Sequence, residues 1–388
     1  MEEIDIAVVG AGPAGLRAAE VVAGMGRKVT VFEGKPSVGR KFLVAGRGGL
    51  NITHGEPFET FITRYEGGSH WEEILREFDA DALRDWCHGL GIETFQATSG
   101  RVYPKVLKGA SILRAWLARL KTLAVEIRPG CLWKELLPGN ILCFQDQDQV
   151  RAKAVIFALG GGSWPRTGSD GGWLEKFQEM GIGCAPLQSS NCGWECEWPP
   201  QILAEAEGLP IKNLRLNVGR ASVLGELLIT RYGLEGGAIY ALGSKLRAMK
   251  EPAVTIDFKP TFSEAELLEK LRGIEGNLLE GATRRWTLSV PARAVLSRKN
   301  YPSAESLAAE VKSCRIALLR PRPLAEAISS AGGVLWNELN EQLMLLKHPG
   351  IFICGEMIDW DAPTGGYLLQ GAFATGSRAG KGAVAFSG

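Results

Sequence analysis

The apolar positions near the start of the chain fall into two short runs separated by glycines. Ile4 to Val9 form a run rich in β-branched residues, which predicts a buried strand. The run leads directly into Gly10-Ala-Gly-Pro-Ala-Gly15 and then into helix-forming sequence. A second apolar run, Val29 to Phe32, follows the helix. The pattern therefore predicts strand, glycine turn, helix and strand in that order.

The same change from an apolar run to glycine occurs twice more. Ala154 to Leu159 read as a central parallel strand that opens on glycine. Ile351 to Ile353 lead into Gly355-Glu356, and Gly365-Gly366 then open a predicted helix over 367–378. Open α/β sheets bind ligands beyond the carboxyl ends of their strands. We therefore expect both ends of the chain to build one nucleotide domain, with a large insertion between its halves.

The remaining elements are predicted with less detail. We expect a glycine-rich basic loop over 34–54 and a compact turn at Gly100 to Lys105. Helices are expected over 71–90, 111–120 and 237–249, and short strands over 123–127 and 131–136. Short apolar runs between 188 and 262 indicate a β-rich unit. Residues 263–313 read as helical, with Ser263 and Ser303 as N-caps.

The first glycine turn has the spacing of a dinucleotide-binding site. Gly10 permits a tight turn, Gly12 lets the backbone approach a pyrophosphate, and Gly15 lets the helix lie close to the strand. The helix N-terminus then offers free N–H groups to phosphate oxygens. Glu33 ends the second strand, where an acid accepts hydrogen bonds from a ribose diol. The alternative is a purely structural turn, but strand, helix, second strand and acid in register favour nucleotide binding.

Composition and charge exclude several classes of partner. The chain has 388 residues, 45% of them hydrophobic and 22% charged, as in globular proteins with two or three domains. Its 44 basic and 43 acidic residues create no net field that would recruit nucleic acid or an anionic membrane. The apolar runs are far shorter than the ~20 residues that span a bilayer. The start MEEID lacks a basic signal-peptide region, so we expect a cytoplasmic protein.

Cysteine and histidine usage points away from disulfides and metals. Eight cysteines are scattered through the chain, which favours reduced thiols. Cys192 and Cys196 are spaced CxxxC, and we expect an incidental or structural role for them rather than a redox pair. The four histidines show no metal-ligand spacing, so no metal site is predicted. Redox chemistry would then require an organic cofactor.

Five motifs together carry a family resemblance. They are Val9 to Gly15, Gly39 to Leu43 with Gly46 to Thr53, Gly100 to Pro104, Ala158 to Gly161 with Ser163 and Pro165, and Gly355-Glu356 with Thr364 to Tyr367. The chain resembles, over essentially its full length, the BaiN/YhiN-type bacterial flavoprotein family, usually labelled NAD(P)/FAD-dependent oxidoreductase. Three positions depart from the family pattern. Gly49 and Leu50 stand where the family commonly has arginine and cysteine, and Leu368 stands where many members have asparagine.

The resemblance implies a fold class and a domain arrangement. The fold would be α/β, with a Rossmann-like FAD-binding domain of the glutathione-reductase type interrupted by a small β-barrel and a helical subdomain. The FAD-binding domain would comprise 1–187 and 322–388. The β-barrel-like insert would comprise 188–262 and 314–321, and the helical subdomain 263–313.

The resemblance also implies FAD as cofactor and a set of contacts to it. Glu33 would hold the adenosine ribose, Leu132 would lie near adenine, and Arg40 and Lys41 would lie on the pyrophosphate side. The segments 46–53 and 365–367 would border the isoalloxazine. The full set implied is Gly10, Gly12, Pro13, Ala14, Gly15, Glu33, Gly34, Lys35, Arg40, Lys41, Gly46, Gly48, Asn51, Thr53, Leu132, Ala158, Gly160, Gly355, Glu356, Gly365, Gly366 and Tyr367.

The function expected is hydride transfer between flavin and a small organic substrate. No second GxGxxG with a preceding strand and a following acid is present, so NAD(P)H is expected only as a transient reductant. Oxygen is the alternative electron partner of the flavin. A flavin-dependent RNA-modifying or RNA-binding protein and a non-catalytic flavin sensor remain alternatives. No catalytic residue can be named, because structural hydrogen bonding explains Tyr367, Glu356 and His54 equally well. The glycine-rich segment Thr230 to Gly237 is predicted to form either a loop over the flavin that shapes the substrate pocket or a structural hairpin. The sequence does not reveal the substrate or the oligomeric state.

Overall fold

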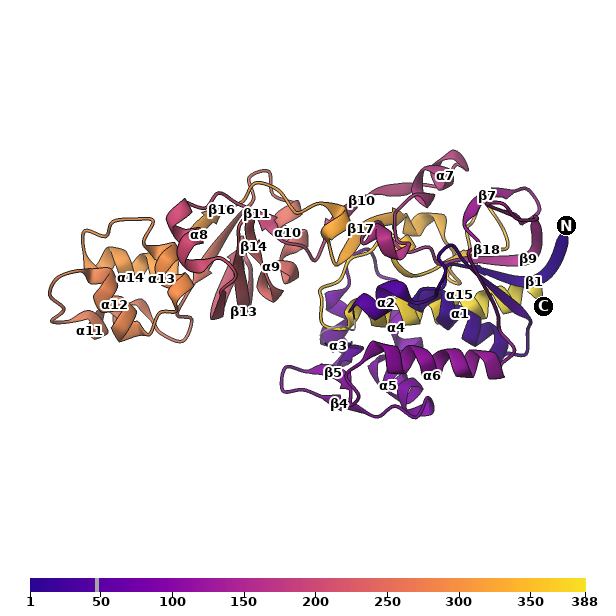
Figure 1. Ribbon diagram of the computed structural model, residues 1–388, viewed down its shortest axis with the longest axis horizontal. Coiled ribbons are helices and arrows are strands. Elements are labelled where there is room, and N and C mark those ends of the chain that lie inside the picture. Colours follow the sequence, from indigo (N-terminus) through magenta and orange to yellow (C-terminus); the bar gives the residue numbers. More distant parts are fainter. Residues whose placement is uncertain (46–48) are drawn as a thin grey trace. The chain divides into compact units, whose positions relative to one another are not determined.

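Two compact units make up the protein. The computed structural model describes residues 1–45 and 49–388 (Figure 1). Unit 1 comprises residues 1–188 and 328–388, and unit 2 comprises residues 189–327. The FAD-binding domain implied by the resemblance, 1–187 and 322–388, has nearly the same bounds as unit 1. Each unit has a hydrophobic core of its own, so each is described separately.

A seven-stranded sheet forms the centre of unit 1. Its parallel strands are β6 (Glu126–Pro129), β2 (Val29–Glu33), β1 (Glu2–Val9) and β9 (Val150–Phe157), in that order, with β18 (Ile351–Ile353) also paired to β9. Val9 is in register with both Phe32 and Phe157, and Phe157 with Ile353. The carboxyl ends of four strands therefore meet at one edge, as the three strand-into-glycine patterns predicted. The antiparallel strands β8 (Ile141–Phe144) and β7 (Trp133–Leu137) complete the sheet.

The first and last helices of unit 1 pack against each other. They are α1 (Pro13–Gly24) and α15 (Tyr367–Ser387), which lie side by side in Figure 1. A Cβ atom at Gly376 would lie 2.4 Å from the carbonyl oxygen of Ala14. One at Gly380 would lie 2.8 Å from that of Ala18. Glycine is thus required for this close approach. The helix predicted to end at 378 continues to 387.

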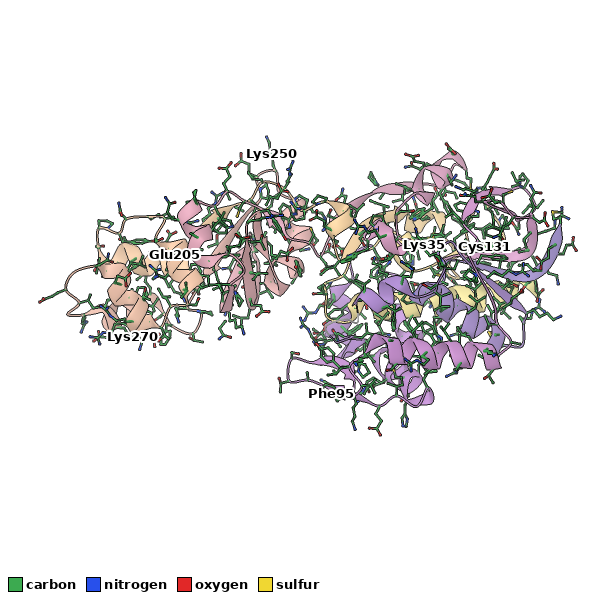
Figure 2. All side chains as sticks on the ribbon, in the orientation of Figure 1. Lys35, Phe95, Cys131, Glu205, Lys250 and Lys270 are labelled. Atoms are coloured by element: carbon green, nitrogen blue, oxygen red, sulfur yellow. The ribbon has the colours of Figure 1, made fainter. Side chains whose placement is uncertain are left out.

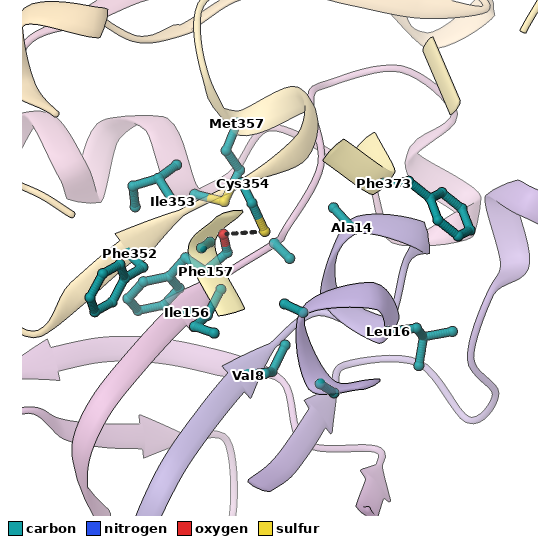
Figure 3. Packing of buried hydrophobic residues seen from close by; sticks show 14 of the residues in the cluster. Val8, Ala14, Leu16, Ile156, Phe157, Phe352, Ile353, Cys354, Met357 and Phe373 are labelled. Carbon is teal, nitrogen blue, oxygen red and sulfur yellow. Dashed lines mark hydrogen bonds between the residues drawn. The ribbon is translucent and has the colours of Figure 1, made fainter. Parts of the chain in front are cut away.

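The core beneath the strand ends is aromatic and aliphatic (Figure 3). Phe157 of β9, Phe352 of β18 and Phe373 of α15 are all at most 1% exposed. The thiol of Cys354 is directed at the carbonyl oxygen of Phe157, 3.7 Å away, as the dashed line in Figure 3 marks. This packing fixes the end of β18, which leads directly into Gly355 and Glu356.

Three sequence predictions in unit 1 are corrected by the structure. The helix predicted over 71–90 is divided into α4 (Trp71–Glu77) and α5 (Ala80–Gly89), because the Asp79 carboxylate accepts the N–H of Ala82 and starts a new helix. The turn predicted at Gly100 to Lys105 contains a strand, β5 (Arg101–Pro104), between β3 (Thr53–His54) and β4 (Thr94–Gln96). The basic loop contains a helix, α2 (Arg40–Ala45).

The other elements of unit 1 are short apart from α6, which continues almost to β6. They are α3 (Phe58–Phe61), η1 (Ile62–Arg64), α6 (Gly109–Thr122), η2 (Pro165–Thr167), α7 (Trp173–Glu179), β10 (Cys184–Ser190), β17 (Ser329–Val334), η4 (Trp336–Glu338) and η5 (Gly355–Met357). The strand predicted over 123–127 begins only at Glu126, since Leu123 to Val125 finish the turn after α6.

A six-stranded antiparallel sheet forms unit 2. Its order is β11 (Trp194–Glu195), β14 (Gly233–Glu235), β13 (Ala221–Thr230), β12 (Pro210–Val218), β15 (Ala253–Asp257) and β16 (Cys314–Ala317). The N–H of Glu195 donates to the carbonyl oxygen of Arg320, 2.9 Å away, and the N–H of Leu319 donates to that of Glu195. The segment after β16 thus returns to β11. Thr230 pairs with Gly233, so this part of the 230–237 segment is a hairpin.

Unit 2 also contains seven short α-helices and one 3₁₀ helix. They are α8 (Pro200–Ala206), α9 (Gly237–Ala241), α10 (Gly243–Arg247), α11 (Glu264–Leu271), α12 (Leu278–Trp286), α13 (Val290–Leu296) and α14 (Ala304–Lys312), with η3 (Leu324–Glu326) near the end. Ser263 and Ser303 both form capping boxes, which confirms the two predicted N-caps. The helix predicted over 237–249 is two short helices joined at Leu242. Within the described ranges, no helix has the length and hydropathy needed to cross a bilayer.

Candidate functional site

A cavity of about 630 Å³ lies beyond the carboxyl ends of the parallel strands of unit 1. Its wall includes the ends of β1, β2 and β9, the start of α1, helix α2, the segment after β18 and the start of α15. The two distant ends of the chain thus meet around one space. Its volume lies within the range of ~300–1,000 Å³ found for small-molecule and cofactor sites.

Most of the predicted cofactor residues line this cavity. Those that do are Gly10, Gly12, Pro13, Ala14, Glu33, Gly34, Lys35, Arg40, Lys41, Asn51, Leu132, Ala158, Gly160, Gly355, Glu356, Gly365 and Gly366. Gly15, Thr53 and Tyr367 are not part of its wall. Gly46 and Gly48 lie outside the described residues.

The glycine turn after β1 leaves its backbone open to a ligand. Gly10 has φ +106°, a conformation that favours glycine, and a Cβ there would lie 2.4 Å from the carbonyl oxygen of Ala158. A Cβ at Gly15 would lie 1.9 Å from the carbonyl oxygen of Gly10, so Gly15 serves the contact between helix and strand. A Cβ at Gly12 would meet no atom within 4 Å, although the residue lines the cavity. The N-terminal N–H groups of α1 therefore start at an unobstructed wall.

Glu33 lies at the opposite side of the turn. Its carboxylate oxygens accept the N–H of Ala11 at 2.9 Å and that of Lys35 at 2.8 Å. Burial raises the pKa of Glu33, and these two hydrogen bonds oppose the rise. Each oxygen keeps a lone pair that can accept from a ligand hydroxyl. The site can therefore bind a diol.

An exposed apolar residue lies close to this acid. The N–H of Cys131 donates to the carbonyl oxygen of Glu33, and the N–H of Gly130 to that of Lys35. Figure 2 shows the resulting proximity of Lys35 and Cys131. The next residue, Leu132, lines the cavity and is 42% exposed. Its side chain offers an apolar surface for a flat ring.

A charged cluster joins α2 to the segment after β18. The Lys41 amine donates to the Glu356 carboxylate at 2.6 Å and to the Ser163 hydroxyl at 2.7 Å. Lys41 and Glu356 both line the cavity. Their side chains are 25% and 16% exposed, so the pair is largely shielded from water.

Four buried polar atoms in residues of the cavity wall have no hydrogen-bond partner within residues 1–45 and 49–388. They are the acceptor Asn51 Oδ1, the hydroxyl oxygen Ser169 Oγ, and the donors Arg40 Nε and Trp133 Nε1. A buried unsatisfied polar group costs ~1–3 kcal/mol, so these atoms are suited to a polar ligand. Ser169, together with Asp170, Trp173 and Lys176, was not predicted as part of the site. The glycine-dense turn 168–172 after a strand-into-glycine pattern was the available signal.

Tyr367 belongs to a cluster beside the cavity wall. Its hydroxyl donates to Glu56 Oε1 at 2.6 Å, and Arg64 donates to both oxygens of Glu56. Burial and the carboxylate raise the pKa of Tyr367 well above its usual value. Burial would raise the pKa of Glu56, but the hydrogen bonds from Arg64 and Tyr367 lower it. The ring of Tyr367 stacks on His54, with 5.4 Å between centroids.

The residues considered for other chemistry can also be placed. The eight cysteines are thiols that form no disulfide, and Cys192 and Cys196 are both buried in unit 2. Burial raises the pKa of the Cys196 thiol to about 12. Outside residues 46–48, no three histidine, cysteine, aspartate or glutamate side chains lie together as metal ligands would.

Parallel strands, a glycine turn opening a helix, and an acid that ends the second strand define a Rossmann-type dinucleotide-binding domain. The chain belongs to the HI0933-like family, because the profile of the HI0933-like protein Rossmann domain matches residues 4–382. This confirms the resemblance to the BaiN/YhiN-type flavoproteins and the prediction of an oxidoreductase enzyme.

Two named relatives align over nearly their full length. A 3-dehydro-bile acid delta(4,6)-reductase of Clostridium scindens is 27% identical, with 98% of each chain covered. A ribosomal RNA dihydrouridine synthase of Escherichia coli is 22% identical, covering 97% of this chain and 96% of the other.

Solved structures share the fold. A 3-ketosteroid delta1-dehydrogenase of Sterolibacterium denitrificans has a TM-score of 0.55 at 11% identity, covering 99% of this chain and 100% of the other. A 3-ketosteroid-delta4-(5alpha)-dehydrogenase of Rhodococcus jostii has a TM-score of 0.53 at 17% identity, covering 99% and 97%. At these identities the likeness concerns the fold alone.

Proposed function

We propose that this protein binds FAD in the cavity of unit 1 and transfers a hydride between the flavin and a small organic substrate. The observation that carries this proposal is the meeting of Glu33, the open Gly12 turn and the start of α15 around one space. When bound, the flavin supplies the redox chemistry, and the protein supplies binding and orientation.

The cavity residues divide naturally among the parts of FAD. Glu33 would accept hydrogen bonds from the ribose diol, and Leu132 would pack on adenine. The N–H groups at the start of α1 would bind the pyrophosphate. Glu356, held by Lys41, would accept from a sugar-alcohol hydroxyl. The start of α15 at Gly366 would place a positive helix end beside the flavin ring.

We also propose the fold subdivisions that the family resemblance implies: an FAD-binding domain of the glutathione-reductase type, a β-barrel and a helical subdomain. The parallel order of β6, β2, β1, β9 and β18 supports an FAD-binding domain of the glutathione-reductase type. The hydrogen bonds from the segment after β16 to Glu195 support a β-barrel in the insert. Helices α11 to α14 would form the helical subdomain.

The substrate class that we propose is a carbon–carbon double bond conjugated to a carbonyl group. The name of the Clostridium relative denotes reduction of such bonds in a 3-oxo bile acid. The name of the Escherichia relative denotes the product of saturating the uracil ring, where the double bond is also next to a carbonyl. Both reactions add a hydride to the carbon remote from the carbonyl and a proton to the carbon adjacent to it. A small molecule is favoured here over RNA, because the net charge is only +1.

A reoxidation experiment tests the proposed function. The purified protein is loaded with FAD, reduced photochemically without oxygen, and mixed with a cyclic enone, a 3-oxo-Δ4 steroid or a uridine-containing RNA. We expect the oxidised flavin spectrum to return with the enones and the saturated ketone to appear in equal amount. Failure to bind FAD, or an unchanged reduced spectrum with every acceptor, would overturn the proposal. Return of the oxidised spectrum with RNA alone would favour the RNA-modifying alternative.

The electron donor needs a separate experiment. We propose a nicotinamide as a transient reductant, since a separate nucleotide domain with its own glycine fingerprint is not encoded. Anaerobic bleaching of the bound flavin by NADH or NADPH would support this donor. No bleaching by either, together with turnover of a substrate in air, would instead identify an oxidase.

A further inference from the structure

The amide of Asn51 is held in one orientation. Its Nδ2 donates to the carbonyl oxygens of Thr53, 2.8 Å away, and Val102, 2.9 Å away. These bonds use both amide protons, so the nitrogen and oxygen cannot be exchanged without losing both. The direction of Oδ1 is therefore fixed by strands β3 and β5.

The fixed oxygen has no donor of its own. Asn51 Oδ1 is buried without a partner in residues 1–45 and 49–388, and Asn51 lines the cavity. It lies 3.8 Å from the position that a Cβ at Gly365 would take. This is an ordinary contact distance, so Gly365, whose φ of +114° favours glycine, lies directly beside this acceptor. A ligand that satisfies Oδ1 must present an N–H or O–H at the end of the cavity beside α15.

The oxidised isoalloxazine ring has one N–H group, at N3, between its two carbonyl groups. We propose that Asn51 Oδ1 accepts the hydrogen bond from flavin N3–H, and so selects the imide edge of the ring. This inference rests on the proposed function, because it requires FAD in the cavity. A hydrogen bond of this kind contributes ~1.4 kcal/mol, or about tenfold in affinity.

Binding of two flavins to the cofactor-free protein tests this assignment. Dissociation constants of FAD and of FAD methylated at N3 are measured by fluorescence quenching. We expect wild-type protein to bind the N3-methyl form at least tenfold more weakly. The variant Asn51→Ala should bind both forms with similar affinity, because the acceptor that distinguishes them is gone. Ser169→Ala is the matched control, since it removes another unpaired oxygen of the cavity wall and should keep the discrimination.

The outcomes separate the inference from the proposed function. Equal binding of both flavins by the wild-type protein, or discrimination that persists in Asn51→Ala, would overturn the role of Asn51 while FAD binding still stands. Binding of neither flavin would overturn the proposed function as well. If Asn51→Ala does not fold, the wild-type comparison still decides, supplemented by the infrared shift of the flavin carbonyl bands on binding. That shift is expected with FAD and absent with the N3-methyl form.

Discussion

Lys41 Nζ lies 2.6 Å from Glu356 Oε2, across 315 positions of sequence. The pair joins helix α2, just after the nucleotide-binding turn, to the segment that follows β18. Both residues line the cavity, so the contact holds two parts of its wall together. A wall held by such contacts within the protein lowers the ordering cost of a bound cofactor.

Loss of the Lys41 charge should weaken both the fold and cofactor binding. Lys41→Met leaves the shielded Glu356 carboxylate without its amine, and we expect a loss of ~2 kcal/mol in the free energy of unfolding. Urea denaturation of the FAD-free protein measures this. The control is Lys153→Met, whose ion pair with Asp5 has a lysine 65% exposed and should contribute less than ~1 kcal/mol. Equal losses in the two variants would contradict the role of shielding.

Gly376 should tolerate no methyl group. The Gly376→Ala substitution places Cβ 2.4 Å from the carbonyl oxygen of Ala14, so α15 must move away from α1, and we expect a loss of ~1–3 kcal/mol. Gly24→Ala, at the exposed end of α1 with no atom near its Cβ, should gain up to ~1 kcal/mol instead. Thermal unfolding of both variants checks the opposite signs. A Gly376→Ala variant with unchanged stability would show that α1 and α15 have room to separate.

Glu33 should give unfolding a specific pH dependence. Because burial raises its pKa in the folded protein, the folded state binds this proton more tightly than the unfolded chain. The contribution of Glu33 to stability therefore falls as pH rises from the ordinary value of 4.5 through the raised value, and is constant above it. The difference in unfolding free energy between wild type and Glu33→Gln should shrink over that window. A difference that grows with pH would mean that the carboxylate is net stabilised by Ala11 and Lys35.

Arg101 should raise the midpoint potential of the bound flavin. Its Nε lies 3.6 Å from the position of a Cβ at Gly365, at the end of the cavity proposed for the flavin ring. Negative charge that develops there on reduction would be stabilised by the guanidinium, by ~1 kcal/mol or about 20 mV for a two-electron couple. Arg101→Gln should lower the potential by this amount. Arg151 lies at the amino end of β9, away from the cavity, so Arg151→Gln should leave the midpoint potential unchanged. Equal shifts in the two variants would contradict the placement of the flavin ring near Arg101.

Three of the parallel strands were predictable, because β1, β9 and β18 are each an apolar run that leads into glycine. β2 was predicted from its apolar run and the acid that ends it, whereas β6 begins three residues later than the strand predicted over 123–127. The strand β5 was not predicted, because Val102 is the one β-branched residue of Arg101–Pro104, and Gly100 and Pro104 at its ends indicate a turn. Its hydrogen bonds with β3 and β4 define it, and pairing between distant segments leaves little trace in local sequence.

The residues of the cavity wall were predicted best where backbone geometry requires a residue type. Gly10, Gly12 and Glu33 each follow from the space or hydrogen bond that a nucleotide needs. Ser169 was missed because a hydroxyl in a turn usually satisfies its own backbone. Tyr367 was assigned to the cofactor by the family resemblance. Its hydroxyl donates to Glu56, 311 positions away, and local sequence does not reveal this contact.

The interrupted course of unit 1 has a consequence for how the protein is made. Strand β18 and helix α15 follow unit 2 along the chain, so a ribosome completes the insert, with its separate core, before either emerges. Domains generally fold as units during synthesis. During translation, the sheet of unit 1 therefore lacks β18 beside β9 until the insert has been made. We expect the cofactor to bind only after this last strand has been added. A premature stop upstream of β18 would yield an intact insert on a chain unable to hold its nucleotide.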